Sequence, residues 1–145
     1  MLDCSNNILK NTNKLPVINY KEFNSCEKLA KSLNGIGFAV LSNHGLDANL
    51  IQTVYASWRE FFKSGNKSGF EFDQNTHDGY VSSEKSETAK GNNIKDLKAF
   101  YHYYKSGRCP DYLQKDTSIL FNMLENMACE LLSSLEKYLP DDIKN

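Results

Sequence analysis

Histidine and aspartate are the residue types in this chain that could bind a metal ion together, if their spacing allowed it. The histidines are His44, His77 and His102. A transition-metal site of this kind needs a second histidine and a carboxylate close by. His77 is followed directly by Asp78, but neighbouring side chains on an extended segment point to opposite sides. The sequence therefore predicts no metal-ligating residue and no catalytic residue in this chain.

The cysteines form no recognisable reactive or metal-binding pair. No two of them have C-x-x-C spacing, which argues against a zinc ribbon and a thioredoxin-like site. The polar N-terminus lacks the apolar run of a secretion signal, so we expect reduced thiols and a cytoplasmic protein. Cys26 and Cys129 are expected to be small core residues. The full set is Cys4, Cys26, Cys109 and Cys129.

Composition limits the partners that this chain can have. Its 145 residues suit one domain, with 40% hydrophobic and 24% charged residues. The net charge of −1 argues against a nucleic-acid partner, which would need a basic excess. No apolar run approaches the roughly 20 residues of a membrane span. Arg59 and Arg108 are the arginines, so few residues could clamp a dicarboxylate.

The first half of the chain predicts a strand, a helix and a second strand. Residues 15–20 contain a short β-branched stretch. Residues 24–37 show helical spacing, with a cap at Asn24 or Ser25 and a stop at Asn34 and Gly35. Its expected buried face consists of apolar residues at helical spacing: Phe23, Cys26, Leu29, Ala30 and Leu33. The apolar run 38–41 predicts a strand covered on both faces, and this order favours a crossover unit.

The rest of the chain predicts further helices and short strands. Asp47 can cap a helix that ends before Gly65. Short strands are expected around 79–83 and 99–104, and a last helix over 117–138, with Leu120 to Leu139 on its apolar face. We therefore expect an α+β domain at 15–140, between a flexible arm at 1–14 and a tail at 141–145.

Several strings in this order resemble the N-terminal domain of the isopenicillin N synthase-like, 2-oxoglutarate-dependent dioxygenases. Residues 15–19 and the Phe61-Phe62 pair are similar to conserved strings of that family, and the later segment resembles its bacterial members. The matching residues of the Asn-His-Gly segment are Gly37, Phe38, Val40, Asn43, His44 and Gly45. Those of the later segment are Gly79, Tyr80, Glu87, Asp96, Leu97, Lys98 and Phe100, with Ala99 in place of the usual glutamate.

The resemblance implies an oxygenase that uses iron(II), O2 and usually 2-oxoglutarate to oxidise a small organic substrate. In the family, a helix-and-strand domain of this kind packs on a double-stranded β-helix, or jelly roll, that carries a His-x-Asp motif, a distant histidine and an Arg-x-Ser motif. None of these motifs occurs in this chain. We therefore expect a domain truncated relative to the family, with no cofactor-binding residue, that is inactive by itself.

A substrate-side role is the remaining functional prediction for named residues. The resemblance implies that the segment around Gly79 and Tyr80 approaches the substrate entrance, where His77 and Tyr80 could offer hydrogen bonds. The simpler interpretation is a turn glycine and a half-buried tyrosine. For His44, we expect a structural role in satisfying backbone groups. Asp96 and Lys98 are expected to be an exposed charged pair.

Two functions remain open. The first is the N-terminal structural and substrate-entrance domain of an oxygenase, whose partner is the absent C-terminal jelly roll. The alternative is a free-standing interaction module, or an oxygenase remnant, that binds a partner protein, including a second copy of itself. Unpaired strand edges and an apolar helix face predict marginal stability or self-association of the isolated chain. An unrelated enzyme would need a catalytic constellation that the sequence lacks.

Overall fold

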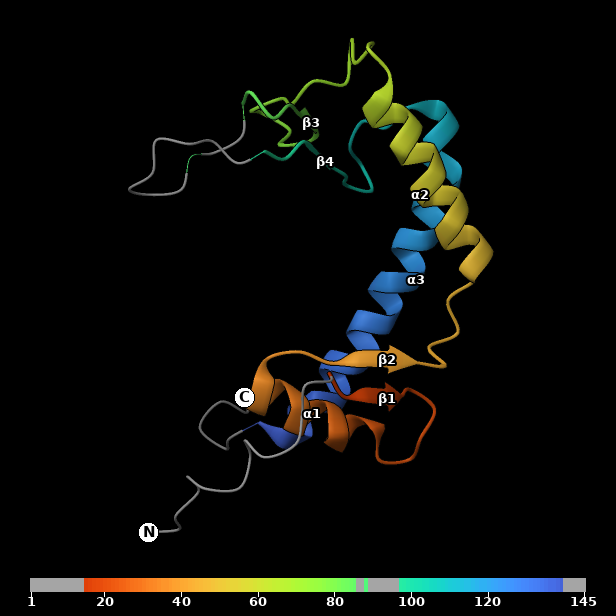
Figure 1. The fold of residues 1–145 in the computed structure, drawn as a ribbon, viewed down its shortest axis with the longest axis vertical. Coiled ribbons are helices and arrows are strands. Elements are labelled where there is room, and N and C mark those ends of the chain that lie inside the picture. The colour runs from red at the N-terminus through yellow and green to blue at the C-terminus, as the bar shows by residue number, and fades with distance from the viewer. Residues whose placement is uncertain (1–14, 86–87, 89–96, 140–145) are drawn as a thin grey trace. The chain divides into compact units, whose positions relative to one another are not determined.

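The computed structural model describes residues 15–85, 88 and 97–139, and this part of the chain is α+β, as predicted. It consists of two compact units. One contains the residues up to Leu46 together with those from Glu125 onward, and the other contains Asp47–Leu124. We call these the first and the second unit. The predicted arm at 1–14 and the tail at 141–145 lie outside the described residues. Figure 1 shows the labelled elements of each unit.

The first unit contains the predicted crossover. Strand β1 (Val17–Asn19) leads into helix α1 (Ser25–Ile36), which returns to strand β2 (Val40–Ser42). The strands are parallel, with Ile18 opposite Leu41, and lie side by side in Figure 1. A parallel pair needs such a crossover because its second strand must start at the same end as the first. The Ser32 hydroxyl donates to the Phe38 carbonyl at 2.5 Å and ties the helix to the following segment.

Helix α1 ends later than the sequence predicted. It continues through Asn34 and Gly35 to Ile36. Gly37 then adopts a left-handed conformation, with φ of 76°, and its N–H donates to the Leu33 carbonyl. Only glycine takes this conformation without a steric cost, so Gly37 terminates the helix. At the other end, Asn24, one of the two predicted positions, is the N-cap residue, but its side chain makes no capping hydrogen bond.

The expected burial of the first unit is partly wrong. Ile18 and Leu29 form its core, at 3% and 5% exposed. Phe23 and Leu33 from the predicted helix face are exposed, and so are Phe38 and Val40 from the strand expected to be covered on both faces. The physical reason is that β1 and β2 form a two-stranded sheet within the described residues. A sheet of two short strands offers too little surface to bury the side chains on both of its faces.

The second unit is built on an aromatic core. Helix α2 (Ala48–Lys63) starts at Asp47, whose side chain accepts from the Asn49 amide as predicted. Strands β3 (Gly79–Val81) and β4 (Phe100–His102) pair in antiparallel register, with Tyr80 opposite Tyr101. Phe61, Cys109 and Leu113 are buried at the centre. The rings packed around them are Trp58, Phe62, Phe70, Tyr80, Tyr101 and Tyr103.

Helix α3 (Asp111–Leu135) begins six residues before the predicted start at residue 117 and is followed by a 3-10 turn, Glu136–Tyr138. The carbonyl of Pro110 accepts from the amides of Leu113 and Gln114. Proline suits this position because it cannot donate inside a helix. The first turns are polar, so apolar periodicity alone did not reveal them. Trp58 donates to the Thr117 hydroxyl at 2.9 Å, which joins α2 to this part of α3.

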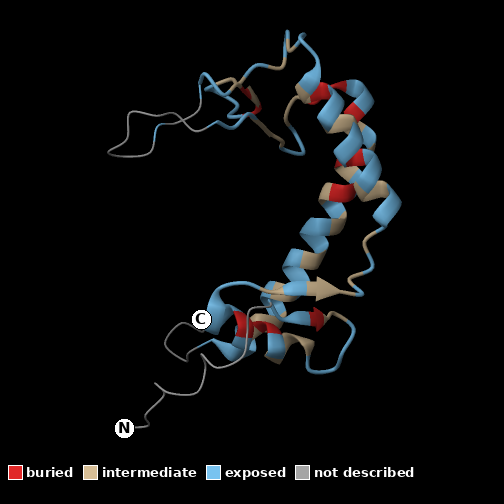
Figure 2. Cartoon of the chain, viewed as in Figure 1, coloured by how far each residue is buried: buried red, intermediate tan, exposed pale blue. Residues whose placement is uncertain are grey.

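Burial along α3 is concentrated near its start. Leu113, Thr117 and Leu120 are buried, whereas Leu124 is 46% exposed. Figure 2 shows that much of the helix is exposed or intermediate. Cys129, expected in the core, is exposed, and Cys26 is half-buried; among the cysteines in the described residues, Cys109 is the buried one. Although α3 is the longest helix in the described part of the chain, its sequence is not apolar enough for a bilayer crossing.

Candidate functional site

The predicted substrate-side residues lie close together in the second unit: His77 follows a turn that leads into strand β3, and Gly79 and Tyr80 are the first residues of that strand. Asp73 organises this turn: its side chain accepts from the amides of Asn75 and Thr76, and its carbonyl accepts from the amide of His77. These hydrogen bonds hold the pKa of the Asp73 carboxyl below its usual value. His77 has a positive φ of 57°. Non-glycine residues adopt this conformation rarely, and it is found often at functional sites.

Asp78 is the most completely buried polar residue of this turn, at 1% exposed. Its Oδ1 accepts from Nε and Nη2 of Arg108, at 3.1 and 2.7 Å, and from the Thr76 hydroxyl at 2.7 Å. Its Oδ2 accepts from the backbone N–H of Arg108 at 2.6 Å. Hydrogen bonds from Arg108 and Thr76 hold the pKa of the Asp78 carboxyl far below its usual range. The carboxylate is thus ionised and fully engaged.

Arg108 connects three separate parts of the second unit. Besides Asp78, its guanidinium donates to the carbonyls of Gly69 and Glu71, each at 3.0 Å. Its own carbonyl accepts from the Tyr101 hydroxyl at 2.7 Å. The hydrogen bond to Asp78 raises the pKa of the guanidinium. Because its donors are committed to protein groups, Arg108 is a structural clamp and not a binder of a free carboxylate.

Gly79 is required at its position by space and by backbone conformation. Its φ is 109°, and a Cβ atom there would lie 2.6 Å from the carbonyl oxygen of Glu71. The neighbouring segment approaches closely because Tyr80 donates its amide to the Phe70 carbonyl and accepts from the amide of Phe72. Gly79 therefore allows two backbone segments to pack against each other.

The side chain of Tyr80 packs into the aromatic core. Its ring lies 6.0 Å from that of Phe61 and 5.9 Å from that of Phe62. The ammonium of Lys67 lies over the rings of Phe61 and Tyr80, at 4.7 and 5.3 Å. Lys67 also donates to the carbonyls of Phe61 and Ser64, where it satisfies the end of α2. Of the three predicted substrate-side residues, only His77 has an exposed side chain.

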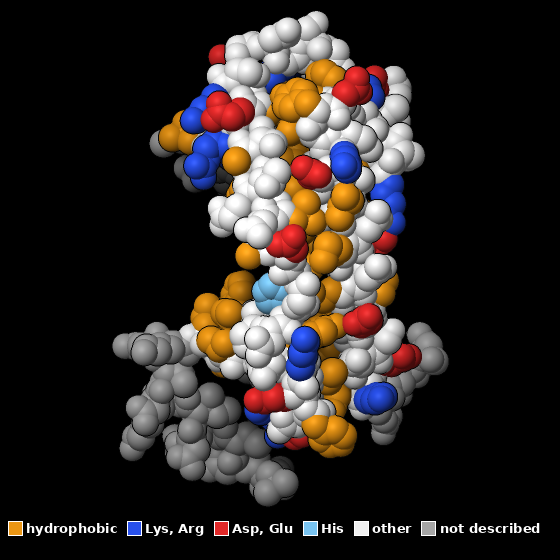
Figure 3. Space-filling model, turned by 90° about the vertical axis from the view of Figure 1, so that its right-hand side faces the viewer, with side chains coloured by type: hydrophobic (Ala, Val, Ile, Leu, Met, Phe, Trp, Pro, Cys, Tyr) orange, Lys and Arg blue, Asp and Glu red, His pale blue; other side chains and the backbone are white. Residues whose placement is uncertain are grey.

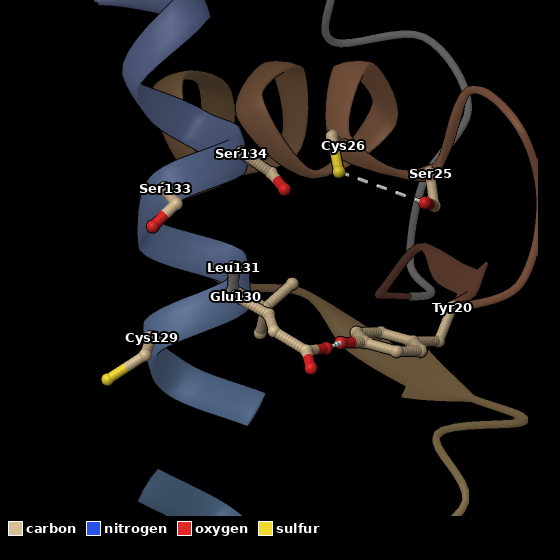
Figure 4. Close-up of a pocket in the computed structure, with 8 residues that line it drawn as sticks. All are labelled: Tyr20, Ser25, Cys26, Cys129, Glu130, Leu131, Ser133 and Ser134. Atoms are coloured by element: carbon tan, nitrogen blue, oxygen red, sulfur yellow. Dashed lines mark hydrogen bonds between the residues drawn. The ribbon is translucent and has the colours of Figure 1, made fainter. Parts of the chain in front are cut away.

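A cavity lies in the first unit (Figure 4), lined by Tyr20, Ser25, Cys26, Cys129, Glu130, Leu131, Ser133 and Ser134. The Tyr20 hydroxyl points at Glu130 and donates to its carboxylate at 2.6 Å. This hydrogen bond is the main reason that the pKa of Tyr20 is raised. In Figure 4 the Cys129 side chain points away from Tyr20 and Cys26. The arrangement joins α3 to the segment after β1 and contains no activated nucleophile.

The described residues do not fit an iron site. Within residues 15–85, 88 and 97–139, no three histidine, cysteine, aspartate or glutamate side chains gather closely enough to hold a metal ion. An iron(II) site of the kind implied by the resemblance needs two imidazoles and a carboxylate. We therefore derive no chemical step through iron from the residues of this chain.

Two other predicted residue roles have different outcomes. His44 accepts the Leu46 amide on Nδ1 at 3.2 Å, which confirms that it satisfies a backbone group near the end of β2. Asp96 and Glu87 lie outside the described residues, so the predicted Asp96–Lys98 pair stays a prediction. The Lys98 ammonium lies 5.6 Å from the centre of the Phe100 ring.

Sequence reasoning missed the Asp78–Arg108 pair, which organises the whole site. The two residues are thirty positions apart, and no local spacing rule connects them. One signal was present: Arg108 is one of two arginines among fifteen lysines, and arginine is the residue suited to a buried, multiply bonded ion pair.

Comparisons with known proteins point to an oxygenase domain. A family model described as "non-haem dioxygenase in morphine synthesis N-terminal" matches residues 15–119. A solved structure of a protein from Shewanella oneidensis, described as a candidate oxygenase, is similar, with 42% sequence identity and a TM-score of 0.76. The match covers 90% of this chain and 47% of that one, so this chain spans about half the length of that relative. No curated protein matches.

Proposed function

Because the chain belongs to the non-haem dioxygenase N-terminal family, we propose that it is the structural and substrate-entrance domain of an Fe(II)/2-oxoglutarate-dependent oxygenase acting on a small organic substrate. In this proposal, catalysis requires a jelly-roll domain that carries the metal ligands. The observation that carries it is the 42% identity to a candidate oxygenase about half of which this chain spans. Iron would supply oxygen activation from the other domain.

The proposed contribution of this chain is a rigid wall beside the substrate entrance. Asp78 and Gly79 are buried and held in place. His77, which comes directly before them, is exposed. A binding group held by rigid neighbours is positioned more accurately than one on a free loop. His77 is thus the residue through which this segment would contact a substrate, with Gly79 and Tyr80 supporting it.

Complementation with the other half of the Shewanella oneidensis relative tests this function. The part of the relative that this chain does not match is produced in three forms: alone, fused to this chain, and, as a control, joined to the matching part of its own chain. We expect oxygen uptake that depends on iron(II) and 2-oxoglutarate from both fusions and none from this chain alone. Stoichiometric iron(II) binding together with oxygen uptake by the isolated 145-residue chain would overturn the proposal.

A specific observation also supports the alternative of an interaction module. Leu15, Val17 and Phe38 around the β1–β2 pair are 54%, 67% and 68% exposed. Figure 3 shows hydrophobic side chains reaching the surface among charged ones on one face of the molecule. Exposed apolar groups beside a strand edge that no other described strand pairs favour association with another protein surface. In the first proposal the jelly roll covers this apolar surface, and in the alternative a second copy of the chain covers it.

Light scattering with variants separates these occupants. In the alternative, the isolated chain forms dimers, which Val17→Thr with Phe38→Gln weakens by about tenfold or more, because it removes apolar contact area. Tyr55→Gln, an exposed residue of α2 in the second unit, is the control and should leave association unchanged. If the added jelly-roll half dissociates the dimer, the same face binds both the jelly roll and a second copy. If the chain is a monomer at all concentrations, a second copy is ruled out.

A further inference from the structure

Four rings of the second unit follow one another in contact, and we call them the ring strip: His77, Phe72, His102 and Phe100. The centre of the Phe72 ring lies 6.3 Å from that of His77 and 5.5 Å from that of His102. The His102 ring lies 5.0 Å from that of Phe100. Imidazole and phenyl rings therefore alternate along the strip, and each contact is within the range of aromatic pairs.

The strip remains accessible because of how its residues are placed. Phe100 and His102 are two positions apart on β4, so both side chains lie on the same face of the strand. The cross-strand partner of His102 is Gly79, which has no side chain to cover the imidazole. His77 is exposed, and Phe72, Phe100 and His102 are half-buried, so none of the four rings is buried. Tyr101, on the opposite face of β4, packs against Trp58 and Phe61 in the core.

The backbone beneath the strip is rigid. Next to His77, Asp78 is held by Arg108 and Thr76. Phe72 is held by the hydrogen bond from its amide to the Tyr80 carbonyl. The rings are inclined to one another, by 60° at Phe72–His77, 70° at Phe72–His102 and 34° at His102–Phe100. A flat ligand can stack on one inclined ring and meet the edge of the next, which is the favoured geometry for aromatic contacts.

We propose that the ring strip is a binding surface for a planar, uncharged aromatic compound that carries a hydrogen-bonding substituent. The rings supply stacking, and each neutral imidazole has one N–H donor and one acceptor nitrogen for the substituent. Charges of both signs flank the strip, since Asp73 and Glu71 lie near His77 and Phe72 and the Lys98 ammonium lies 5.6 Å from the centre of the Phe100 ring, so an uncharged ligand suits the whole strip best. This proposal deepens the proposed function by naming a substrate class. It rests on that function only where it identifies the bound ligand with the substrate of the oxygenase.

Nuclear magnetic resonance of the full chain tests the surface with matched probes. Benzamide is planar, aromatic and neutral, and cyclohexanecarboxamide carries the same amide on a saturated ring. We expect benzamide to shift the imidazole signals of His77 and His102 with a dissociation constant on the order of millimolar. The saturated amide should bind about fivefold more weakly. His44, which belongs to the other unit, is the internal reference.

Two variants and one control make the result specific. Phe72→Leu removes the ring between His77 and His102 and should weaken the binding of benzamide about fivefold. His77→Asn removes one imidazole while keeping a residue that tolerates positive φ, and should weaken binding while the shift at His102 persists. Tyr55→Leu removes an exposed ring outside the strip and should have no effect. Circular dichroism and the Trp58 indole signal establish that each variant is folded.

The proposal fails if benzamide leaves His77 and His102 unshifted, or if both amides or all three histidines respond equally. Its failure is distinguishable from that of the proposed function. If benzamide binds but His77→Asn leaves the KM and kcat of the complemented oxygenase unchanged, the surface exists and is not the substrate entrance. If complementation succeeds and benzamide does not bind, the domain assignment stands and the ligand class is wrong.

Discussion

The Asp78 carboxylate accepts hydrogen bonds from both the guanidinium and the backbone amide of Arg108, thirty residues further along the chain. The same guanidinium donates to the carbonyls of Gly69 and Glu71. This one side chain therefore joins the segment after α2, the turn before β3 and the start of α3. Strand β3 has three residues, which are too few to fix the turn before it alone.

Substitution of Arg108 should destabilise the second unit strongly. Arg108→Ala leaves the buried Asp78 carboxylate with the Thr76 hydroxyl and one backbone amide, and we expect a loss of about 3 kcal/mol in the free energy of unfolding. Arg108→Lys keeps the charge but cannot reach the carboxylate and two carbonyls together, so about 2 kcal/mol should be lost. Urea unfolding followed by the fluorescence of Trp58, the single tryptophan, measures both.

The matched control for this series is Arg59→Ala on α2, where the side chain is exposed. Surface substitutions usually change stability by less than about 0.5 kcal/mol. Equal stability of Arg108→Ala and Arg59→Ala would show that the clamp contributes nothing to the fold.

The contribution of Asp78 should depend on pH in a defined direction. The folded protein holds the pKa of its carboxyl below the value in the unfolded chain, mainly through hydrogen bonds from Arg108. Such a group stabilises the fold at pH values above about 4 and loses this effect as the pH falls further. We therefore expect the stability difference between the natural protein and Asp78→Asn to be largest near pH 7 and to shrink below about pH 4.

Urea unfolding at several pH values between about 7 and 2.5 provides the measurement. Asp73, whose pKa is also lowered, is present in both proteins, and it enters the difference only through its electrostatic interaction with Asp78, which is weaker than its hydrogen bonds from Asn75 and Thr76. A difference that stays constant over the whole range would mean that the Asp78 charge does not stabilise the fold.

Gly79 should not tolerate a side chain. Gly79→Ala combines a positive φ with a Cβ atom placed 2.6 Å from a backbone oxygen, and backbone atoms cannot move aside cheaply. We expect a loss of about 3 kcal/mol or failure to fold. Gly65→Ala is the control, because nothing lies within 4 Å of its added Cβ. The relative thermal stability of the two variants checks this, and comparable melting temperatures would contradict it.

The comparison of sequence and structure shows which kinds of inference succeed. The order of strand, helix and strand was predictable because the parallel pairing of Ile18 with Leu41 needs a crossover, and Asp47 was predictable as a cap because capping is local. Burial was less predictable: Phe38 has a core residue's chemistry but is exposed, since burial depends on which surfaces are present to cover it. The Asp78–Arg108 pair was not predictable because its partners meet only in three dimensions.

Cysteine reactivity should follow the observed burial, and it differs from the sequence-based expectation. Burial raises the pKa of the Cys109 thiol to about 11, so at neutral pH it stays protonated and unreactive. Cys129 is exposed and Cys26 half-buried. In a Cys4→Ser background, a disulfide reagent such as DTNB should react rapidly with one thiol at pH 8, more slowly with a second, and with the third only after urea is added. Cys129→Ser should remove the rapid phase, and Cys109→Ser should remove only the thiol released by urea. Rapid reaction of Cys109 in the folded chain would show that the aromatic core around it opens readily.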